Sequence, residues 1–399
     1  MSGIAQLEVA TTLERGGGKW LGLCGLRAVD ARVPAAFCIE AGHFRDLAAR
    51  LELDASTTAL ARASEQERAP LAAALRTRIR EAPFQDPLRA DILDAYHRLG
   101  APRVAVRSSA TAEDLRHASF AGQYDTLLDV QGDAALLDAV AACWASTFSE
   151  RAVASRQRVG ISQREVAMAV VVQELVVAEC SGVAFTRHPL EGRPVLLVEA
   201  CRGLGEALVA GRLDPDRFEI DREGSDWRCL SDSQGTGLDA HRLLAMRDEF
   251  LRLEAELGFE ADLEWSWQGG QLFLLQARPI TTEIPVDGAN PPGDGESLRG
   301  TAASPGRATG RARVLLVADQ DELEAGDVLV TPFTDPAWTR HFSRACALVM
   351  ERGGLLCHGA ILARECGIPA VVGLRDATGR IEEGSTICVD GDAGRVERA

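Results

Sequence analysis

The spacing of apolar residues divides the chain into stretches of different predicted structure. From residue 44 to residue 99, alanine and leucine recur at helical spacing among arginine and glutamate, which predicts a helix-rich N-terminal region. Between about residues 101 and 282, short valine- and leucine-rich runs bounded by polar residues or glycine predict strands mixed with helices. The clearest of these predicted strands are 104–106, 166–172, 195–199 and 272–276.

Residues 283–300, EIPVDGANPPGDGESLRG, contain Pro, Gly, Asp and Glu but almost nothing apolar, which predicts a linker. The residues after it alternate between predicted strands and helices, as in a compact α/β module. The strands are 314–317, 328–331, 347–350, 370–372 and 386–389, and the helices are 338–345 and 358–366. We therefore expect one domain over 1–285, a linker over 286–300 and a second domain over 301–399. The linker is either a passive spacer or a tether that lets the small domain visit two sites.

Charge and cysteine content narrow the class of protein. The net charge of −16 argues against nucleic acid or an anionic membrane as the main partner. No apolar run approaches the roughly 18 residues of a membrane helix, and the N-terminus lacks a basic region followed by an apolar one. The ten cysteines are scattered and form no C-x-x-C pair, which favours reduced thiols. We expect a cytoplasmic protein.

Lys19 is the only lysine among the 43 lysine and arginine residues. A GC-rich genome explains the arginines but not this exception. Arginine cannot replace lysine where a compact ammonium is needed, so we predict a functional role for Lys19. It ends the run Arg15-Gly-Gly-Gly-Lys19, whose glycines would let backbone amides approach a phosphate. A flexible turn is the alternative interpretation of this run.

A second group of polar residues follows the predicted strand 104–106. Arg107 leads into a turn rich in hydroxyl groups, and a loop of small residues follows over 119–123, just before Thr126. A guanidinium and loop amides together suit a polyphosphate. The alternative is a helix capped by Ser108 or Ser109, and the pattern alone favours neither.

Two further oxygen-bearing side chains lie on what look like successive strands. Glu264 and Gln276 flank residues 267–270, whose Gly-Gly pair predicts a hairpin. Paired oxygen ligands from facing strands suit Mg²⁺, and Arg278 would then hold the same phosphates. The alternative is a polar strand pair that faces solvent.

The fourth group surrounds a histidine near the C-terminus. Gly353 and Gly354 precede a predicted helix that has His358 in its first turn. Histidine is a nucleophile at neutral pH, and a phosphoryl group on it would face the positive end of the helix dipole. A capping histidine is the alternative. Cys357 suggests a Cys–His or zinc site, but no further ligand lies nearby in the sequence.

Taken in order, these motifs resemble one family. The segments GGGKWLGL, VAVRSSATAEDLRHASFAGQYDTLL, CWASTFSERAV, GLGEALVAGRLDPDRF and DLEW–LLQARPIT resemble the nucleotide-binding domain of phosphoenolpyruvate synthase, pyruvate phosphate dikinase and rifampin phosphotransferase. GDVLVTPFTDPAW and GGLLCHGAILARECGIPAVVG resemble their swivelling phosphohistidine domain. The resemblance implies an α/β fold, with an ATP-grasp-like nucleotide-binding domain linked to a small swivelling β/β/α phosphohistidine domain.

The resemblance also implies residue roles. ATP would pass its β-phosphoryl group to His358 and leave as AMP, with Mg²⁺ as cofactor. By matching position, Lys19, Arg107 and Arg278 would hold phosphates and, with His358, carry the catalysis. The remaining implied positions are Gly122 and Thr126 at the phosphate loop, Gln173 and Glu174 beside adenine and ribose, and Glu264 and Gln276 on Mg²⁺.

Two positions depart from the family pattern. Leu356 stands where relatives usually have threonine, and Gly359 stands where they usually have alanine. The first change removes a hydroxyl that helps to hold the imidazole or its phosphoryl group, and the second is expected to loosen the helix start.

Three hypotheses follow. The leading one is a phosphotransferase that acts on a small-molecule acceptor. The acceptor is expected to bind on the two domains or on a separate protein, because no barrel or antibiotic-binding domain fits in the 399 residues. The second hypothesis is a phosphocarrier that delivers the phosphoryl group to a separate catalytic chain. The third is a non-catalytic nucleotide-binding regulator, suggested by the two departures and opposed by the retained site residues.

Overall fold

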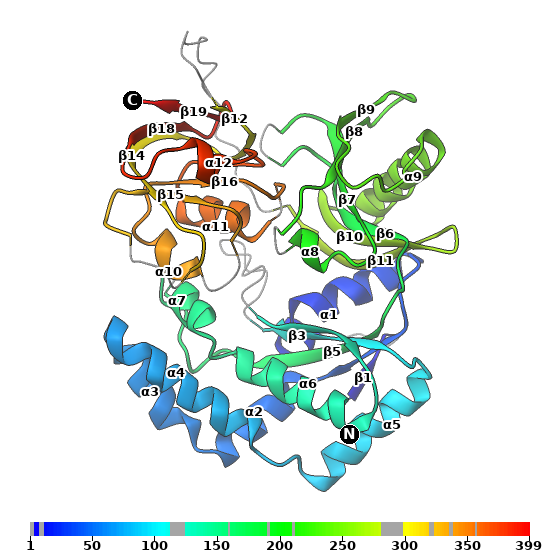
Figure 1. The fold of residues 1–399 in the computed structure, drawn as a ribbon. Helices are drawn as coiled ribbons and strands as arrows, with labels where there is room; N and C mark the ends of the chain where they lie inside the picture. Colours follow the sequence, from blue (N-terminus) through cyan, green and yellow to red (C-terminus); the bar gives the residue numbers. More distant parts are fainter. Residues whose placement is uncertain are drawn as a thin grey trace. The chain divides into compact units, whose positions relative to one another are not determined.

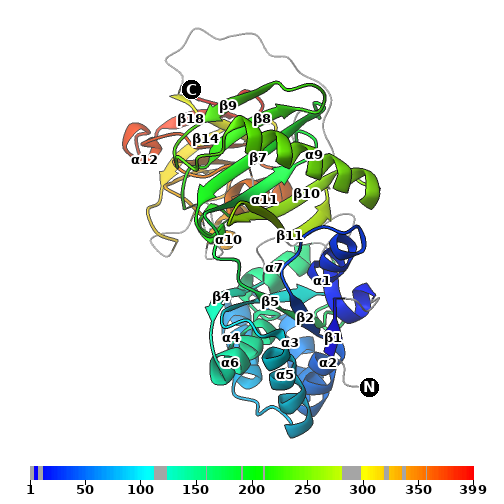
Figure 2. The same cartoon turned by 90° about the vertical axis from the view of Figure 1, so that its right-hand side faces the viewer.

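The computed structural model describes residues 4–7, 12–111, 124–158, 160–189, 192–209, 212–280, 298–318, 323–334, 338–355 and 357–399. It divides into two compact units, which we describe separately. Unit 1 comprises Met1–Val177 and Gly270–Arg278, and unit 2 comprises Ala178–Gly269 and Pro279–Ala399. The elements of both are labelled in Figure 1 and, from a second direction, in Figure 2.

Unit 1 is built on an antiparallel sheet with the strand order β1-β2-β5-β3-β4. The strands are β1 (Ile4–Gln6), β2 (Ala36–Ile39), β3 (Val104–Ala110), β4 (Thr126–Val130) and β5 (Met168–Glu174). Its helices are α1 (Leu13–Ala28), α2 (Ala41–Arg50), α3 (Leu53–Arg62), α4 (Glu65–Arg80), α5 (Asp86–Leu99), α6 (Asp133–Ser146) and α7 (Glu150–Arg158). The helix-rich region expected before residue 100 is therefore confirmed.

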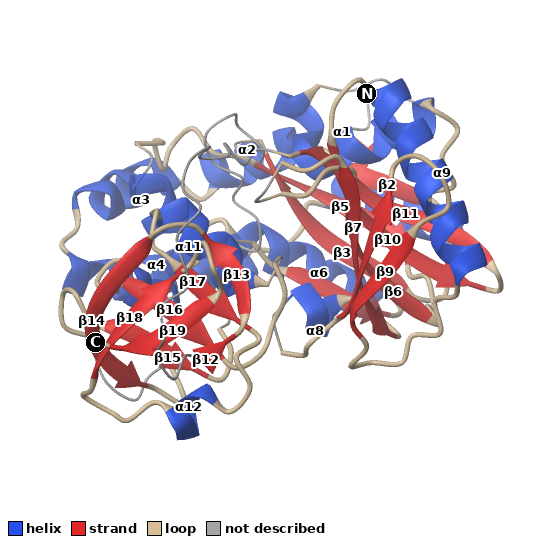
Figure 3. Cartoon of the chain, turned by 90° about the horizontal axis from the view of Figure 1, so that it is seen from above, coloured by secondary structure: helices blue, strands red, loops and turns tan. Residues whose placement is uncertain are grey.

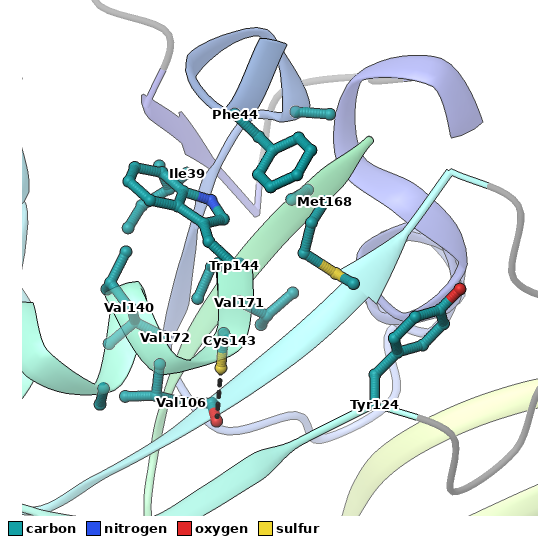
Figure 4. Packing of buried hydrophobic residues seen from close by; sticks show 14 of the residues in the cluster. Ile39, Phe44, Val106, Tyr124, Val140, Cys143, Trp144, Met168, Val171 and Val172 are labelled. Carbon is teal, nitrogen blue, oxygen red and sulfur yellow. Dashed lines mark hydrogen bonds between the residues drawn. The ribbon is translucent and has the colours of Figure 1, made fainter. Parts of the chain in front are cut away.

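Helices α1 and α6 lie on opposite faces of this sheet. Consecutive strand residues point to opposite faces, and on β3 the Ser108 hydroxyl meets α6 while the Ser109 hydroxyl meets α1. Figure 4 shows the apolar packing beneath α6, where Cys143 approaches Val106. The Cys143 thiol donates to the Val106 carbonyl at 3.6 Å.

The glycine run of the sequence lies inside α1, where it allows close packing. Gly17 has φ of +74°, and a Cβ there would lie 2.2 Å from the carbonyl oxygen of Ser109. Gly22 meets the strand β11 (Gln271–Pro279) in the same way, since its Cβ would lie 2.4 Å from the Ala277 carbonyl oxygen. These glycines therefore bring α1 against the strands that carry Arg107 and Gln276.

Unit 2 contains an antiparallel run of strands in the order β10-β6-β7-β8-β9. They are β6 (Cys180–Phe185), β7 (Val195–Arg202), β8 (Asp216–Asp221), β9 (Trp227–Ser231) and β10 (Ala261–Gln268), with helices α8 (Glu206–Val209) and α9 (Ala240–Leu257). After β10, Gly269 and Gly270 both have positive φ, as in a two-residue hairpin turn. The predicted turn between the strands of Glu264 and Gln276 is thus present.

The C-terminal part of unit 2 is an eight-stranded sheet in the order β12-β19-β18-β14-β15-β16-β17-β13 (Figure 3). Its strands are β12 (Leu298–Arg299), β13 (Thr301–Ser304), β14 (Arg307–Val314), β15 (Val328–Thr331), β16 (Ala347–Met350), β17 (Ala370–Val372), β18 (Thr386–Asp390) and β19 (Arg395–Arg398). Its helices are α10 (Thr339–Phe342), α11 (His358–Cys366) and α12 (Ala377–Arg380). The predicted bounds of β15, β16, β17 and α11 are confirmed.

Three predicted elements differ from the structure. The strand 314–317 is wrong, because β14 ends at Val314 and the side chains of Leu316 and Val317 are 54% and 60% exposed. The helix 338–345 shrinks to the single turn of α10. The predicted linker loses its end, since Leu298 and Arg299 form β12. Because 281–297 lie outside the described residues, the predicted domain boundaries stay a prediction.

The two parts of unit 2 share one apolar core. Val183, Phe185 and Leu197 of the antiparallel strands cluster with Leu348 and Leu355 of the C-terminal part. In the portion of the chain that the structure describes, no helix is both long enough and apolar enough to cross a bilayer.

Candidate active site

Three of the predicted residues meet on one face of the unit 1 sheet. Arg107 on β3 is only 9% exposed, and its Nη1 donates to Gln173 Oε1 at 3.4 Å and to the Leu275 carbonyl at 3.2 Å. Its Nη2 donates to Gln276 Oε1 at 3.0 Å. Thr126 lies opposite Arg107 in the β3–β4 register, so its side chain belongs to the same face. The structure therefore brings Gln276 of the third polar group to Arg107 of the second.

Helix α1 brings Lys19 to this face. Ser109, two residues after Arg107 on β3, donates from its hydroxyl to the Gly16 carbonyl at 2.8 Å and accepts from the Trp20 amide at 3.2 Å. These bonds fix α1 on both sides of Lys19, which is partly buried. Arg278 follows Gln276 by two residues on β11 and so points to the same side of that strand.

The helix cap predicted at Ser108 or Ser109 is wrong, whereas the polyphosphate role of Arg107 and of the loop after it stays a prediction. Ser108 and Ser109 form neither a phosphate-binding turn nor a helix cap, because they continue β3 to Ala110. The Ser108 hydroxyl is bonded to the Ser146 hydroxyl at 3.2 Å, while that of Ser109 is used by α1. The serines therefore hold two helices against the sheet and are not available to a ligand.

Gln173 fits a ligand better than Glu174 does. The Gln173 side chain is buried, and its Nε2 has no hydrogen-bond partner among the described residues. A buried amide donor left unsatisfied costs about 1–3 kcal/mol, so a ligand acceptor at this position would be stabilising. Glu174 follows on the other face of β5 and is exposed. Gly122 lies outside the described residues.

Glu264 belongs to a row of side chains that crosses the unit 2 sheet. The register pairs Glu264 with Val183, Val183 with Glu199, and Glu199 with Arg217. Directly paired residues on antiparallel strands share a face, so both glutamates lie on the same face of this sheet. Asp262, two residues before Glu264, lies on this face too and is buried.

The donors proposed for Mg²⁺ fit a hard cation only in part. A Glu264 carboxylate and a Gln276 amide oxygen are ligands of the right chemistry, although Gln276 Oε1 also accepts from Arg107. Glu264 belongs to unit 2 and Gln276 to unit 1. Within the described ranges no group of three or more His, Cys, Asp or Glu is arranged around a metal position. Phosphates and water would have to complete the coordination, as is usual for Mg²⁺.

His358 is the first residue of α11, and its ring is held by neighbours from other elements. Its Nδ1 lies 3.3 Å from Thr334 Oγ1, and the ring meets Phe342 edge-on at 6.3 Å. The Thr334 hydroxyl donates to Met350 Sδ at 3.5 Å, so its oxygen is the acceptor for a proton on Nδ1. We assign the proton to Nδ1 on this network, which places the lone pair on Nε2.

Gly359 makes this arrangement possible. A Cβ at Gly359 would lie 2.5 Å from Thr334 Oγ1 and 2.4 Å from Met350 Sδ. The glycine therefore brings the start of α11 tightly against the hydroxyl that holds His358. Sequence reasoning missed Thr334, although it lies in the quoted motif TPFTDPAW. Leu356 lies outside the described residues.

Cys357 does not behave as a reactive thiol. It is buried beside His358, and this burial raises the pKa of the thiol to about 11. At neutral pH the group is therefore protonated, whereas a nucleophile or a zinc ligand would need the thiolate. Among the residues that the structure describes, no group of three or more possible metal ligands surrounds Cys357.

Comparison with known proteins identifies the family. Residues 13–233 match the model of the pyruvate phosphate dikinase AMP/ATP-binding domain, which covers more than half of the chain. Residues 323–394 match the mobile domain of PEP-utilising enzymes. The chain belongs to the phosphoenolpyruvate synthase and pyruvate phosphate dikinase family. This confirms the predicted fold class, with its ATP-grasp-like nucleotide-binding domain and its small swivelling phosphohistidine domain.

Curated relatives match nearly the whole chain. The probable phosphoenolpyruvate synthase of Archaeoglobus fulgidus is 34% identical over 95% of this chain and 56% of its own length. The phosphoenolpyruvate synthases of Aeropyrum pernix and Neisseria meningitidis are 33% and 35% identical over 95% and 97% of this chain, and each match covers 56% of the relative. The chain thus spans about half the length of the curated relatives it matches.

Proposed function

We propose that the chain is an AMP-forming phosphotransferase that passes the β-phosphoryl group of ATP through His358 to a small-molecule acceptor. One observation carries this proposal: the His358 ring starts α11 with its Nδ1 held by Thr334, in a domain of the PEP-utilising type. An AMP/ATP-binding domain in the same chain supports ATP as the donor.

In this proposal Arg107, Lys19 and Arg278 bind the phosphates of ATP, and Thr126 and Gly122 line the phosphate loop. The buried Nε2 of Gln173 would donate to the nucleotide, which would satisfy that amide. Mg²⁺ held by Glu264 and Gln276 would neutralise phosphate charge. Catalysis of phosphoryl transfer rests mainly on such positioning and neutralisation.

In the first step the histidine ring is the nucleophile. The lone pair of His358 Nε2 attacks the β-phosphorus, the bond from that phosphorus to the oxygen shared with the α-phosphorus breaks, and AMP leaves with the bonding electrons. Nε2 then carries the β- and γ-phosphoryl groups. Water or inorganic phosphate attacks the γ-phosphorus, the bond from the γ-phosphorus to the β–γ bridging oxygen breaks, and the β-phosphoryl group alone stays on Nε2. Nδ1 keeps its proton throughout, and the Thr334 oxygen accepts it in a hydrogen bond. In the second step an oxygen of the acceptor attacks the phosphorus, and Nε2 recovers its lone pair.

The names of the relatives suggest the acceptor to test first. They are phosphoenolpyruvate synthases, and the matching family model is named for pyruvate phosphate dikinase. Pyruvate is therefore the first acceptor and phosphoenolpyruvate the first product to measure. Cleaving two phosphoanhydride bonds per turnover would supply the energy to phosphorylate a poor acceptor such as an enol.

The intact mass of the purified chain after incubation with Mg-ATP tests the half-reaction, with the nucleotides separated by chromatography. We expect a gain of one phosphoryl group and one equivalent of AMP, both absent in His358→Ala. His97→Ala is the control, because His97 is an exposed histidine whose Nε2 lies 2.9 Å from Asp133 Oδ1. AMP formation in His358→Ala, or a phosphoryl gain lost equally in His97→Ala, would refute the role of His358.

A further inference from the structure

Two charged side chains, the buried Glu199 and the half-buried Arg364, hold the peptide that precedes the histidine. The Leu355 amide donates to Glu199 Oε1 at 3.0 Å, and the Leu355 carbonyl accepts from Arg364 Nη2 at 2.7 Å. The Gly353 amide donates to Asp214 Oδ1 at 3.0 Å. Leu355 lies three residues before His358, so these bonds fix the segment that leads into α11.

The partners of this segment come from two different domains. Arg364 lies on α11, within the match to the mobile domain. Glu199 and Asp214 lie within the match to the AMP/ATP-binding domain. If the mobile domain moves, Arg364 travels with His358, whereas the bonds to the two carboxylates must break.

The surroundings of Glu199 fix its carboxylate at this contact. Its carboxylate is 1% exposed, and Arg217 donates to Oε1 from Nε at 2.9 Å and from Nη2 at 2.8 Å. A Cβ at Gly354 would lie 2.4 Å from both carboxylate oxygens, so only glycine fits there. A buried carboxylate is costly unless it is paired and hydrogen-bonded, and the loop amide supplies one of those bonds.

The same carboxylate lies in one row with Glu264, a predicted Mg²⁺ ligand of the same unit. Glu199 and Glu264 lie in one row of the sheet with only Val183 between them. Two strand spacings are about 10 Å, so the row places the Leu355 contact beside the expected phosphate and Mg²⁺ ligand. Docking on Glu199 therefore holds the loop before His358 on the sheet face that carries Glu264.

We propose that Glu199 is a docking latch that positions the His358 loop on the ATP-binding sheet, and that phosphorylation of His358 opens it. This inference rests on the proposed function. A phosphoryl group adds about two negative charges, which a neutral imidazole lacks. The latch would thereby hold the histidine until it is charged and then release it towards the acceptor.

The charge of Glu199 already acts close to His358. Burial raises the pKa of the neighbouring Cys357 thiol, and the Glu199 carboxylate raises it further. A phosphoryl group on the next residue would meet the same field in a region of low dielectric, where like charges repel strongly. Asp214, bonded to the Gly353 amide, would add to this repulsion.

The first arm of the test uses the whole chain without nucleotide. Hydrogen exchange resolved to single amides would compare Glu199→Gln with Glu219→Gln. Glu219 is the matched control, because it is a buried carboxylate on β8 bonded to Arg193 and Arg228. We expect Leu355 to exchange about tenfold faster in Glu199→Gln and at the wild-type rate in Glu219→Gln, since a bond to a charged acceptor is lost. Equal rates at Leu355 would overturn the latch.

A kinetic measurement separates positioning from general damage. At saturating ATP, phosphohistidine formation should slow about tenfold in Glu199→Gln while the Kd for ATP stays unchanged. If Glu199→Gln does not fold, Asp214→Asn takes its place, with Gly353 as the reporting amide. A raised Kd with an unchanged rate would contradict a docking role.

The second arm tests release by charge. After Mg-ATP, chains with a phosphoryl group by mass should exchange faster at Leu355 than unmodified chains, and equal exchange would overturn the release. A comparison of Leu355 exchange in His358→Glu and His358→Gln tests release by negative charge without ATP, and we expect the faster exchange in His358→Glu. If Mg-ATP adds no phosphoryl group, the proposed function fails. The amide exchange of Glu199→Gln and the comparison of His358→Glu with His358→Gln would still show whether Glu199 acts as the latch.

Discussion

Thr334 provides the sharpest prediction about catalysis. Thr334→Val keeps the shape of the side chain but removes the oxygen that lies 3.3 Å from His358 Nδ1. Both residues are buried, so water cannot readily replace that acceptor. A buried donor that loses its partner costs about 1–3 kcal/mol, and about 1.4 kcal/mol corresponds to a tenfold change in rate. We expect phosphohistidine formation to slow by between about fivefold and a hundredfold.

The direction of this effect follows from the tautomer. With the Thr334 oxygen in place, the proton stays on Nδ1 and Nε2 carries the attacking lone pair. Without it, the proton distributes over both nitrogens, and the phosphohistidine loses the acceptor for its Nδ1 proton. The Kd for ATP should not change, because among the described residues the hydrogen bonds of the Thr334 hydroxyl go to His358 and Met350.

Rapid-quench counting of the base-stable, acid-labile phosphoprotein from β-labelled ATP gives the rate directly. Thr334→Ser is the matched control, because it keeps the hydroxyl and removes only the methyl group. We expect Ser to react at close to the wild-type rate despite a lower free energy of unfolding. If Val reacts like wild type and Ser is the slow variant, packing and not the hydrogen bond positions the ring.

Three further predictions concern the scaffold and the phosphate site. Gly17→Ala should lower the free energy of unfolding by about 2 kcal/mol or more, because its Cβ would lie 2.2 Å from the Ser109 carbonyl oxygen at a φ of +74°. Gly42→Ala is the control: it has open space around it in α2 and should raise the free energy of unfolding by about 0.5–1 kcal/mol in the same chemical denaturation. Arg107→Lys should weaken ATP binding in calorimetry by about tenfold or more, since an ammonium cannot contact Gln173, Gln276 and phosphate with one planar fork. Burial raises the pKa of Asp216, but hydrogen bonds from Gln234 and Thr236 lower it by more, so the pKa is below its ordinary value. The ionised carboxylate therefore stabilises the fold at pH values above about 3.8, and this stabilisation is lost as the pH falls below that value. Melting curves should show a steeper acid loss in the wild type than in Asp216→Asn.

The sequence predicted best those elements whose signal is local. The strands β15, β16 and β17 are short apolar runs between polar residues. Helix α11 begins four residues after the Gly353-Gly354 pair and ends just before Gly367. Each is buried on both sides or on one continuous face, so hydrophobicity alone marks it. The location of His358 at the start of its helix was accessible for the same reason.

The failures have a different physical origin. The Ser109 hydroxyl is satisfied by a carbonyl 93 residues earlier in the chain, and such a partner leaves no local trace. The strand β14 has the polar sequence RATGRARV although it lies inside a sheet. The polar residues are tolerated there because Arg311 pairs with Asp327 and Arg313 pairs with Glu383. Both errors arise where tertiary partners satisfy polar groups that seem to need solvent or a ligand.

The arrangement around Gly359 bears on whether the chain is a catalyst or a regulator. The regulator hypothesis drew on two departures from the family pattern, Leu356 and Gly359. The structure explains the glycine at position 359, because an alanine methyl group there would collide with the Thr334 hydroxyl that holds His358. A chain released from catalysis would have no cause to keep this close fit around a buried histidine. Gly359 therefore supports a histidine that is positioned to react, and Thr334 supplies its ring with a hydroxyl partner.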